Sequence, residues 1–240
     1  MVAKLNLSMS LKFLLTSPEF YMIMIPFVVY VGFFNSLSTL LNNILSPYGF
    51  SENDAGIAGA LLIFVGLVFT AVTSPLVDHF KQFLLAIKLQ VPIIALCFLA
   101  FIWAPSAGTN AVPFAVLSVL GAASFSLIPI VLEYLCEITY PVSPEVTSTI
   151  CWAGGQLLGG IFIIISNALT DGPNGGSGGP EPFNMQRALW FQAVLSLLVA
   201  PLPLGLGLFG RKKYCTMRRV DAEKEPRVSM NNPSATRVVS

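Results

Sequence analysis

The sequence predicts an all-α protein, an integral membrane bundle of six transmembrane helices. Of its 240 residues, 55% are hydrophobic and 10% are charged, and the mean hydropathy is +0.75. Soluble domains carry about 25% charged residues, so the composition excludes an ordinary soluble fold. Six apolar stretches are also long enough to cross a hydrocarbon core of about 30 Å, which takes roughly 20 helical residues. These stretches lack the alternation of barrel strands, and a helix satisfies its own backbone polar groups in lipid.

The six predicted spans divide the chain into three parts. Residues 1–18 are predicted to be a cytoplasmic linker with a short interfacial helix at 10–16. They lack the continuous apolar region and the cleavage site of a signal peptide, so we do not expect one. Residues 19–210 hold the spans, and residues 211–240 are predicted to be a tail that is basic and then disordered. The spans are expected at 20–45, 55–73, 83–103, 112–138, 147–169 and 185–209.

Lysine and arginine residues are distributed unevenly about these spans. If the helices alternate in direction, Arg187 lies on one side of the membrane, and the other cations lie on the opposite side with both termini. Cytoplasmic loops carry an excess of Lys and Arg, so both termini are predicted to be cytoplasmic and the loop at 171–182 to face the other side. The net charge is only +1, which indicates no nucleic-acid partner.

A polar stripe runs along the first span. The stretch "GFFNSLSTLLNN" places Asn35, Ser38, Thr39 and Asn42 at offsets of 0, 3, 4 and 7, which is one face of a helix. A polar stripe inside a membrane faces protein or a water-lined cavity, because contact with lipid is costly. We expect these four residues to contact a substrate. The alternative is hydrogen bonding between helices, which contributes about 0.6–2 kcal/mol for each side chain.

The fifth span combines an aromatic ring with a neutral amide. In "CWAGGQLLGG", Trp152 and Gln156 lie four residues apart and therefore share a helix face. We expect both to address the same substrate, with interhelical hydrogen bonding as the alternative for Gln156. The neighbouring Gly155 and Gly159 are predicted to let two helix backbones approach closely.

Two carboxylates lie near the end of the fourth span, in "SLIPIVLEYLCEITYPVSPE" at 126–145. A buried charge costs at least about 2.5–3.5 kcal/mol, and the partial negative charge of a helix C-terminus adds to that cost. Glu133 and Glu137 therefore need a cation, and the nearest candidates by topology are His79 and Lys81. We expect Glu133 to be the buried acid and Glu137 to be solvated at the membrane interface. The alternative is that both simply reach the interface.

Several motifs together resemble a known transporter family. "STLLNN" in the first span, "EITYPVSPE" after the fourth and "GQLLGG" in the fifth are similar to the feline leukaemia virus subgroup C receptor-related branch of the major facilitator superfamily. The resemblance covers roughly residues 18–210 and corresponds to the C-terminal half of such a transporter. It implies transport of a small organic solute by alternating access, with choline, ethanolamine and haem reported as cargo within the branch.

The resemblance also bears on the substrate. Gln156 matches a cavity-lining glutamine of the branch, whereas Asn35 stands where animal choline carriers have a tyrosine. Quaternary ammonium groups are bound by aromatic cages, so this departure counts against choline. Trp152, Phe33 and Phe34 are the aromatic residues available to replace the missing ring.

The stretch "SPLVDHFKQ" at 74–82 is similar to the cytoplasmic G-x-x-x-D-R-x-G-R signature of the superfamily. Asp78 stands at the aspartate, while His79 and Lys81 differ from the signature. In the resembling family, this loop latches the cytoplasmic side when the transporter opens outward. The resemblance therefore assigns a conformational latch to Asp78, Lys81, Glu133 and Glu137.

The resemblance covers one six-helix half, whereas major facilitator transporters contain two. We expect a truncated or incomplete product, with assembly with a second half or as a homodimer as the alternative. A different class remains open, namely a non-transporting remnant or a regulatory partner of a full-length relative. No catalytic constellation is present in the sequence, so we predict no enzyme, no cofactor and no metal site. The expected partners are the lipid bilayer and a small-molecule solute.

Overall fold

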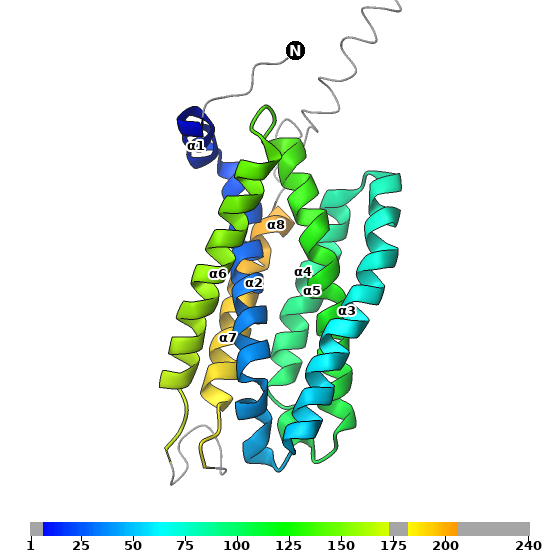
Figure 1. Ribbon diagram of the computed structural model, residues 1–240, viewed down its shortest axis with the longest axis vertical. Coiled ribbons are helices and arrows are strands. Elements are labelled where there is room, and N and C mark those ends of the chain that lie inside the picture. Colours follow the sequence, from blue (N-terminus) through cyan, green and yellow to red (C-terminus); the bar gives the residue numbers. More distant parts are fainter. Residues whose placement is uncertain (1–6, 173–181, 206–240) are drawn as a thin grey trace, which may run out of the picture.

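Six long antiparallel helices form the body of the protein (Figure 1). The computed structural model describes residues 7–172 and 182–205, and these residues form helices and turns without any strand. The prediction of an all-α membrane bundle is therefore confirmed, because six helices are long and apolar enough to cross a membrane. The first five are α2 (Pro18–Leu45), α3 (Glu52–Phe80), α4 (Phe83–Phe101), α5 (Ala111–Ile138) and α6 (Pro144–Ala168). The sixth span, Gln186–Gly205, consists of α7 (Gln186–Val199) and the short helix that follows it.

Short helices flank these spans. The helix α1 (Leu7–Thr16) precedes α2 and includes the predicted interfacial helix, while α8 (Pro201–Gly205) continues α7. Two 3-10 turns, Ser46–Tyr48 and Pro105–Ala107, connect the spans at the end of the bundle opposite α1.

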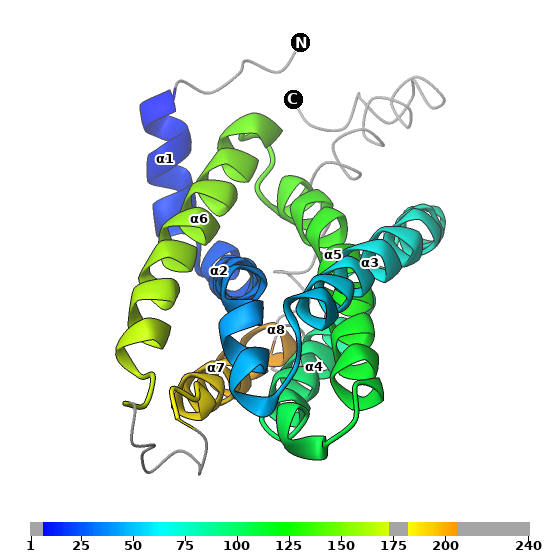
Figure 2. The same ribbon diagram turned by 60° about the horizontal axis from the view of Figure 1, so that its bottom comes forward.

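The bundle is organised around two close helix pairs, α3 with α5 and α2 with α6. The helix α4 packs against both α5 and α7, and α7 in turn packs against α2. These contacts, together with a direct one between α2 and α5, join the two pairs. In the tilted view, α6, α2 and α7 lie on one side of the molecule and α3, α5 and α4 on the other (Figure 2). The helix α2 is the most buried of the six spans, and α3 and α6 are the least buried.

Glycines permit both close pairs. At Gly121 of α5, an added Cβ would overlap the backbone carbonyl of Leu62 on α3, so only glycine fits there. On α6, a Cβ at Gly155 would come within 2.6 Å of Val31 on α2, and one at Gly159 within 3.0 Å of Asn35. The predicted close packing at Gly155 and Gly159 is confirmed, and its partner is α2.

The start of α3 is capped and tied to the start of α5. Ser51 accepts a hydrogen bond from the backbone N–H of Asp54 at 3.2 Å, and the Ser51 N–H donates to the Asp54 carboxylate at 3.0 Å. This reciprocal capping box satisfies two donors that would otherwise lack partners. The Asn110 side chain donates to the same carboxylate at 3.0 Å, so one acidic group holds two helix starts together.

The second span extends beyond its prediction. The expected span ends at 73, but α3 continues through Pro75 to Phe80, so the stretch expected as a loop at 74–82 is mostly helical. Membrane helices tolerate an internal proline because neighbouring groups and local adjustments satisfy the freed carbonyl. Lys81 ends α3 in the left-handed conformation, with φ of 54°, and places a cation beside the negative helix terminus. Asp78 therefore lies on a helix and not in a loop.

The last span is interrupted where the prediction was continuous. The predicted span runs from 185 to 209, whereas α7 ends at Val199 and a short α8 begins at Pro201. Proline lacks the N–H that would continue the backbone ladder, which accounts for the break. The predicted tail at 211–240 and the basic residues in it lie outside the described residues.

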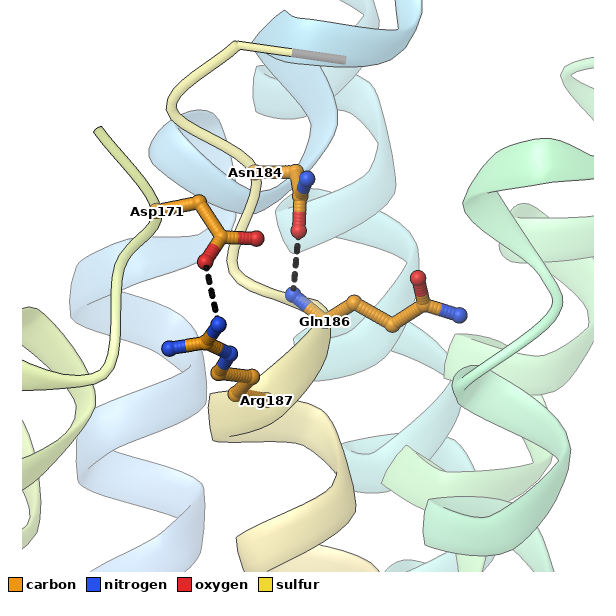
Figure 3. A network of polar contacts seen from close by, with 4 residues as sticks. All are labelled: Asp171, Asn184, Gln186 and Arg187. Atoms are coloured by element: carbon orange, nitrogen blue, oxygen red, sulfur yellow. Dashed lines mark hydrogen bonds and ion pairs between the residues drawn. The ribbon is translucent and has the colours of Figure 1, made fainter. Parts of the chain in front are cut away.

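A polar network closes the base of the loop between α6 and α7 (Figure 3). The carboxylate of Asp171, whose side chain is 2% exposed, forms an ion pair of 3.3 Å with the guanidinium of Arg187, whose side chain is nearly half exposed. The Asp171 N–H donates to the carbonyl of Asn184 at 3.0 Å, and the Asn184 side chain accepts from the N–H of Gln186 at 3.2 Å. Arg187 thus neutralises a buried acid at the end of the bundle opposite α1.

Candidate functional site

A cavity of about 140 Å³ lies between α2, α5 and α6. Its lining is mostly aromatic and aliphatic, with two polar side chains among ten residues and no charged one. Small-molecule sites are commonly apolar hollows with a few placed polar groups, and this cavity has that character. The lining residues are Phe27, Tyr30, Val31, Phe34, Asn35, Ser124, Phe125, Leu127, Ile128 and Trp152.

One face of α2 supplies half of the lining. Its five residues lie at helix positions 0, 3, 4, 7 and 8 relative to Phe27, a spacing that brings side chains onto a single face. Tyr30 is 4% exposed, and its hydroxyl donates a hydrogen bond of 3.1 Å to the backbone carbonyl of Ser196 on α7. That bond holds the Tyr30 ring against α7. Because the hydroxyl proton is engaged there, it is not available to a ligand in the cavity.

Two edge-to-face aromatic pairs line the cavity. Phe27 and Trp152 join α2 to α6, with ring centroids 6.3 Å apart at 84°. Phe34 and Phe125 join α2 to α5, with centroids 5.1 Å apart at 89°. Such pairs are more stable than stacked sandwiches because a positive ring edge meets a negative ring face. Negative ring faces are also what attracts an organic cation.

The predicted amide pair is brought together. The Nδ2 of Asn35 donates to Oε1 of Gln156 at 3.2 Å, which links α2 to α6. Asn35 lines the cavity itself, whereas Gln156 reaches it only through this bond. The bond uses one donor of Asn35, so its carbonyl oxygen remains as an acceptor.

The rest of the predicted polar stripe lies away from the cavity. Ser38, Thr39 and Asn42 are exposed on α2 beyond Asn35, toward the Ser46–Tyr48 end, and none of them is a lining residue. The hydroxyl of Ser38 donates to the backbone carbonyl of Asn35 at 3.2 Å. The face of α2 that lines the cavity continues the face of the predicted polar stripe, but the cavity lies further toward the N-terminus of α2.

Sequence reasoning missed most of the aromatic lining. Of the aromatic residues expected to replace the absent tyrosine, Phe34 and Trp152 do line the cavity. Phe33 does not, because it is fully buried and stacks on Phe162 at 4.5 Å. Phe27 was detectable, since extending the stripe from Asn35 by eight residues toward the N-terminus reaches it. Phe125 was not detectable, because its place depends on how α5 packs against α2.

The predicted latch residues lie at the opposite end of α3 and α5 from the capped starts. Glu133 is half-buried and within electrostatic reach of Asp78, Lys81 and Glu137, with the Asp78 carboxyl close enough to hydrogen-bond it. Within the described residues neither glutamate forms an ion pair. The ammonium of Lys81 instead lies 5.4 Å over the ring of Phe83.

The expected burial of the two glutamates is wrong. Glu137, expected to be solvated, is 7% exposed, and Glu133, expected to be the buried acid, is the more accessible of the two. The end of α5 does not reach solvent as an isolated terminus, since Tyr134, Leu135 and Ile138 around Glu137 are all buried. The Oε2 atom of Glu137 has no hydrogen-bond partner within the described part of the chain.

Comparison with known proteins places the chain among transporters. No family model matches it. Solute carrier family 49 member A3 of Xenopus tropicalis is 32% identical over 187 residues, which are 78% of this chain and 38% of that protein. The choline/ethanolamine transporter FLVCR1 of Felis catus is 29% identical over 169 residues, or 70% of this chain and 30% of that protein. An uncharacterized MFS-type transporter of Caenorhabditis elegans, C09D4.1, is 28% identical over 62% of this chain.

The matched stretches cover most of this chain but only 26% to 38% of the length of these relatives. All three are named as solute carriers or transporters, and two of the names point to the branch whose motifs the sequence carries. The chain is therefore related to major facilitator transporters, and it resembles the feline leukaemia virus subgroup C receptor-related branch of that superfamily.

Proposed function

We propose that the chain forms one six-helix half of a transporter that moves a small organic solute by alternating access. The observation that carries the proposal is the aromatic cavity between α2, α5 and α6, which has room for a small solute. Transporters of this type bind their solute between two bundles. The cavity is then one wall of the site, and the second wall comes from another six-helix half or a second copy of this chain.

The solute that fits the lining best is a small organic cation. Five aromatic rings line the cavity without any carboxylate, which suits a quaternary ammonium better than a primary one. A primary ammonium needs several hydrogen-bond acceptors, and here Asn35 and Ser124 are the polar lining residues. The names of the feline and murine relatives state that they transport choline and ethanolamine, which supports the same class. Of these two, we propose choline.

Ligand binding to the purified 240-residue chain in detergent tests this function. Choline is expected to bind saturably and about tenfold more tightly than 3,3-dimethylbutan-1-ol, its uncharged isostere, because only the cation is attracted to ring faces. Ethanolamine should bind more weakly than choline, for lack of acceptors. Equal binding of choline and the uncharged isostere would reject the cation proposal. No binding of either would mean that this half does not bind the solute without a second wall.

The orientation follows from the charges at the two ends of the bundle. Lys12, Lys81 and Lys88 lie toward one end and Arg187, paired with an acid, at the other. The positive-inside rule favours a cytoplasmic location for the first end and therefore for the N-terminus. A cysteine replacing the exposed Ser106 in intact cells should react with an impermeant maleimide without permeabilisation. Labelling only after permeabilisation would reverse the orientation.

The carboxylates of α3 and α5 are proposed to form a latch on the cytoplasmic side. Lys81 attracts the Glu133 carboxylate whereas Asp78 and Glu137 repel it, so the proposed latch between α3 and α5 rests on the attraction between Glu133 and Lys81. Glu137 is buried one turn further on and is the weaker candidate, although it was assigned to the same latch.

Glu133→Gln is expected to shift a complete transporter containing this half toward its cytoplasm-open state. A cysteine at Ser124, in the cavity lining, should then be labelled about fivefold faster from the cytoplasmic side. Glu137→Gln is the matched control, because it makes the same chemical change one helical turn away and should leave the rate near that of the parent. If Glu133→Gln leaves the labelling rate unchanged, Glu133 is only an interfacial charge.

A further inference from the structure

The C-terminal part of α2 exposes only polar side chains. Between positions 36 and 45, the exposed residues are Ser38, Thr39, Asn42 and Asn43, and every apolar residue is buried. None of these four lines the aromatic cavity, so the proposed solute site does not account for them. Ser38, Thr39 and Asn42 share one face of α2 with Asn35, which does line the cavity.

The exposed polar surface continues from α2 onto α6. Gln156 is exposed on α6 and accepts the hydrogen bond from Asn35, so the two helices present their polar sides together. We call this surface the α2–α6 polar face and define it by Asn35, Ser38, Thr39, Asn42 and Gln156. Its members are amides and hydroxyls, and none of them carries a charge.

The outward faces of α3 and α7 have the opposite character. Every exposed residue of α3 between positions 57 and 72 is apolar, and so is every exposed residue of α7 between positions 190 and 198. Such faces suit contact with acyl chains. Polar side chains inside a span almost always face protein or a water-filled cavity. The α2–α6 polar face is therefore a part of the bundle that lipid covers poorly.

Two amides of this face have unused donors. Within the described residues, the Nδ2 of Asn42 and the Nε2 of Gln156 donate to no protein group. Both side chains are exposed, so a partner can reach them. A serine hydroxyl can bond to its own helix, as that of Ser38 does to the Asn35 carbonyl at 3.2 Å. An amide nitrogen has two N–H donors, and leaving them without acceptors in an apolar medium costs free energy.

A second copy of this chain supplies the matching groups. An amide both donates and accepts, so a surface of amides is complementary to itself. A two-fold axis places the same surface patch on both partners, which requires this self-complementarity. Because the α2–α6 polar face carries no charge, two copies meet on it without repulsion between like charges. Acyl chains offer neither donors nor acceptors.

The distribution of cations restricts how two copies can meet. Both copies have the same arrangement of lysine and arginine residues, so both insert into the membrane in the same direction. A two-fold axis between them then runs along the membrane normal, and each residue lies level with its counterpart. Side chains nearest the axis therefore face the same side chains of the second copy.

We propose that two copies of this chain pair through their α2–α6 polar faces, about a two-fold axis along the membrane normal. The exposed amides of Asn42 and Gln156 then bond to the second copy. The aromatic cavity adjoins this face at Asn35, so each cavity is covered by the other copy. The inference identifies the second wall of the solute site, and in that respect it rests on the proposed function; the pairing itself is independent of the solute.

Cysteine crosslinking of the full 240-residue chain in the membranes of the expressing cells tests the pairing. Ser38→Cys leaves the amides of the face intact, and copper phenanthroline oxidises two neighbouring thiols to a disulfide. A product of twice the chain mass is expected at least about fivefold more for Ser38→Cys than for Leu198→Cys, because a disulfide requires Cα atoms within about 7 Å. Leu198 is 67% exposed on the outward face of α7 and reports random collision. The parent chain, with its four native cysteines, gives the background.

Equal crosslinking of the two variants, or none above the background, overturns the pairing. A crosslinked product of a different mass shows that another chain occupies the face, which overturns the choice of a second copy. Titration of the same membranes with choline separates this proposal from the proposed function. Pairing without choline binding rejects the solute proposal alone, and choline binding by an unpaired chain rejects the pairing alone.

Asn42→Leu locates the contact. Loss of this amide from both copies is expected to raise the dimer dissociation constant about fivefold, measured by single-molecule photobleaching of labelled chains diluted in lipid vesicles. Gln192→Leu is the matched control, because it makes the same kind of change at a buried amide of α7, inside the bundle. It should leave the dissociation constant unchanged. An Asn42→Leu variant that pairs as tightly as Gln192→Leu shows that the α2–α6 polar face is not the contact.

Discussion

Trp152→Ala is expected to weaken choline binding about tenfold. A desolvated cation–π contact with an indole contributes about 2 kcal/mol, and about 1.4 kcal/mol corresponds to a tenfold change in affinity. Exposed cation–π contacts contribute only about 0.5–1 kcal/mol, and Trp152 is 39% exposed, so an intermediate contribution of about 1.4 kcal/mol is expected. Its removal also leaves Phe27 without the ring that meets it edge to face. Titration of the purified chain with radiolabelled choline measures the change.

Two further substitutions separate cation binding from general loss of structure. Trp152→Phe keeps a ring face in the same place and should retain most of the affinity, because phenylalanine attracts cations less strongly than tryptophan but in the same way. Trp190→Ala removes an equally exposed tryptophan that contacts Trp103 outside the cavity. It should leave choline binding unchanged. If Trp190→Ala weakens binding as much as Trp152→Ala does, the aromatic cavity is not the binding site.

Gly121→Ala is expected to destabilise the bundle by about 3 kcal/mol. The new Cβ would overlap the carbonyl of Leu62, and a backbone atom cannot move aside as a flexible side chain can. The helices α3 and α5 must separate to make room, and they form the most extensive helix pair of the structure. Gly66, which faces the same crossing, cannot relieve the strain because a carbonyl and a phenylalanine ring already surround it.

The unfolding temperature in detergent, together with the monodispersity of the purified chain, measures this effect. Gly160→Ala is the control, because a Cβ at that position of α6 meets nothing within 4 Å. It makes the same chemical change in a helix and should be neutral or stabilising by about 0.5–1 kcal/mol. A Gly121→Ala variant as stable as the Gly160→Ala variant would mean that α3 and α5 do not approach as closely as described.

The local features of this protein could be predicted from its sequence. Span length depends on the match between an apolar stretch and the bilayer thickness, which is a property of each segment alone. Pro18–Leu45, Phe83–Phe101 and Ala111–Ile138 accordingly lie within two residues of their predicted ends. The shared face of Trp152 and Gln156 follows from helical periodicity in the same way.

Boundaries set by single residues were predicted less well. Pro75 and Pro201 have the same local chemistry, yet α3 continues through the first and α7 ends before the second. Whether a freed carbonyl finds a substitute partner depends on the neighbouring helices.

Tertiary packing alone decided which residues meet. Phe125 joins Phe34 because α5 packs beside α2, and Glu137 is buried because the end of α5 is covered by other parts of the chain. The α2–α6 polar face exists because α6 packs beside α2 and brings Gln156 to Asn35. Helical periodicity states which side chains of one helix lie together, but every apolar helix face is compatible with several neighbours. The physical reason is that lipid and protein interiors are equally apolar, so close packing at residues such as Gly121 selects the partner.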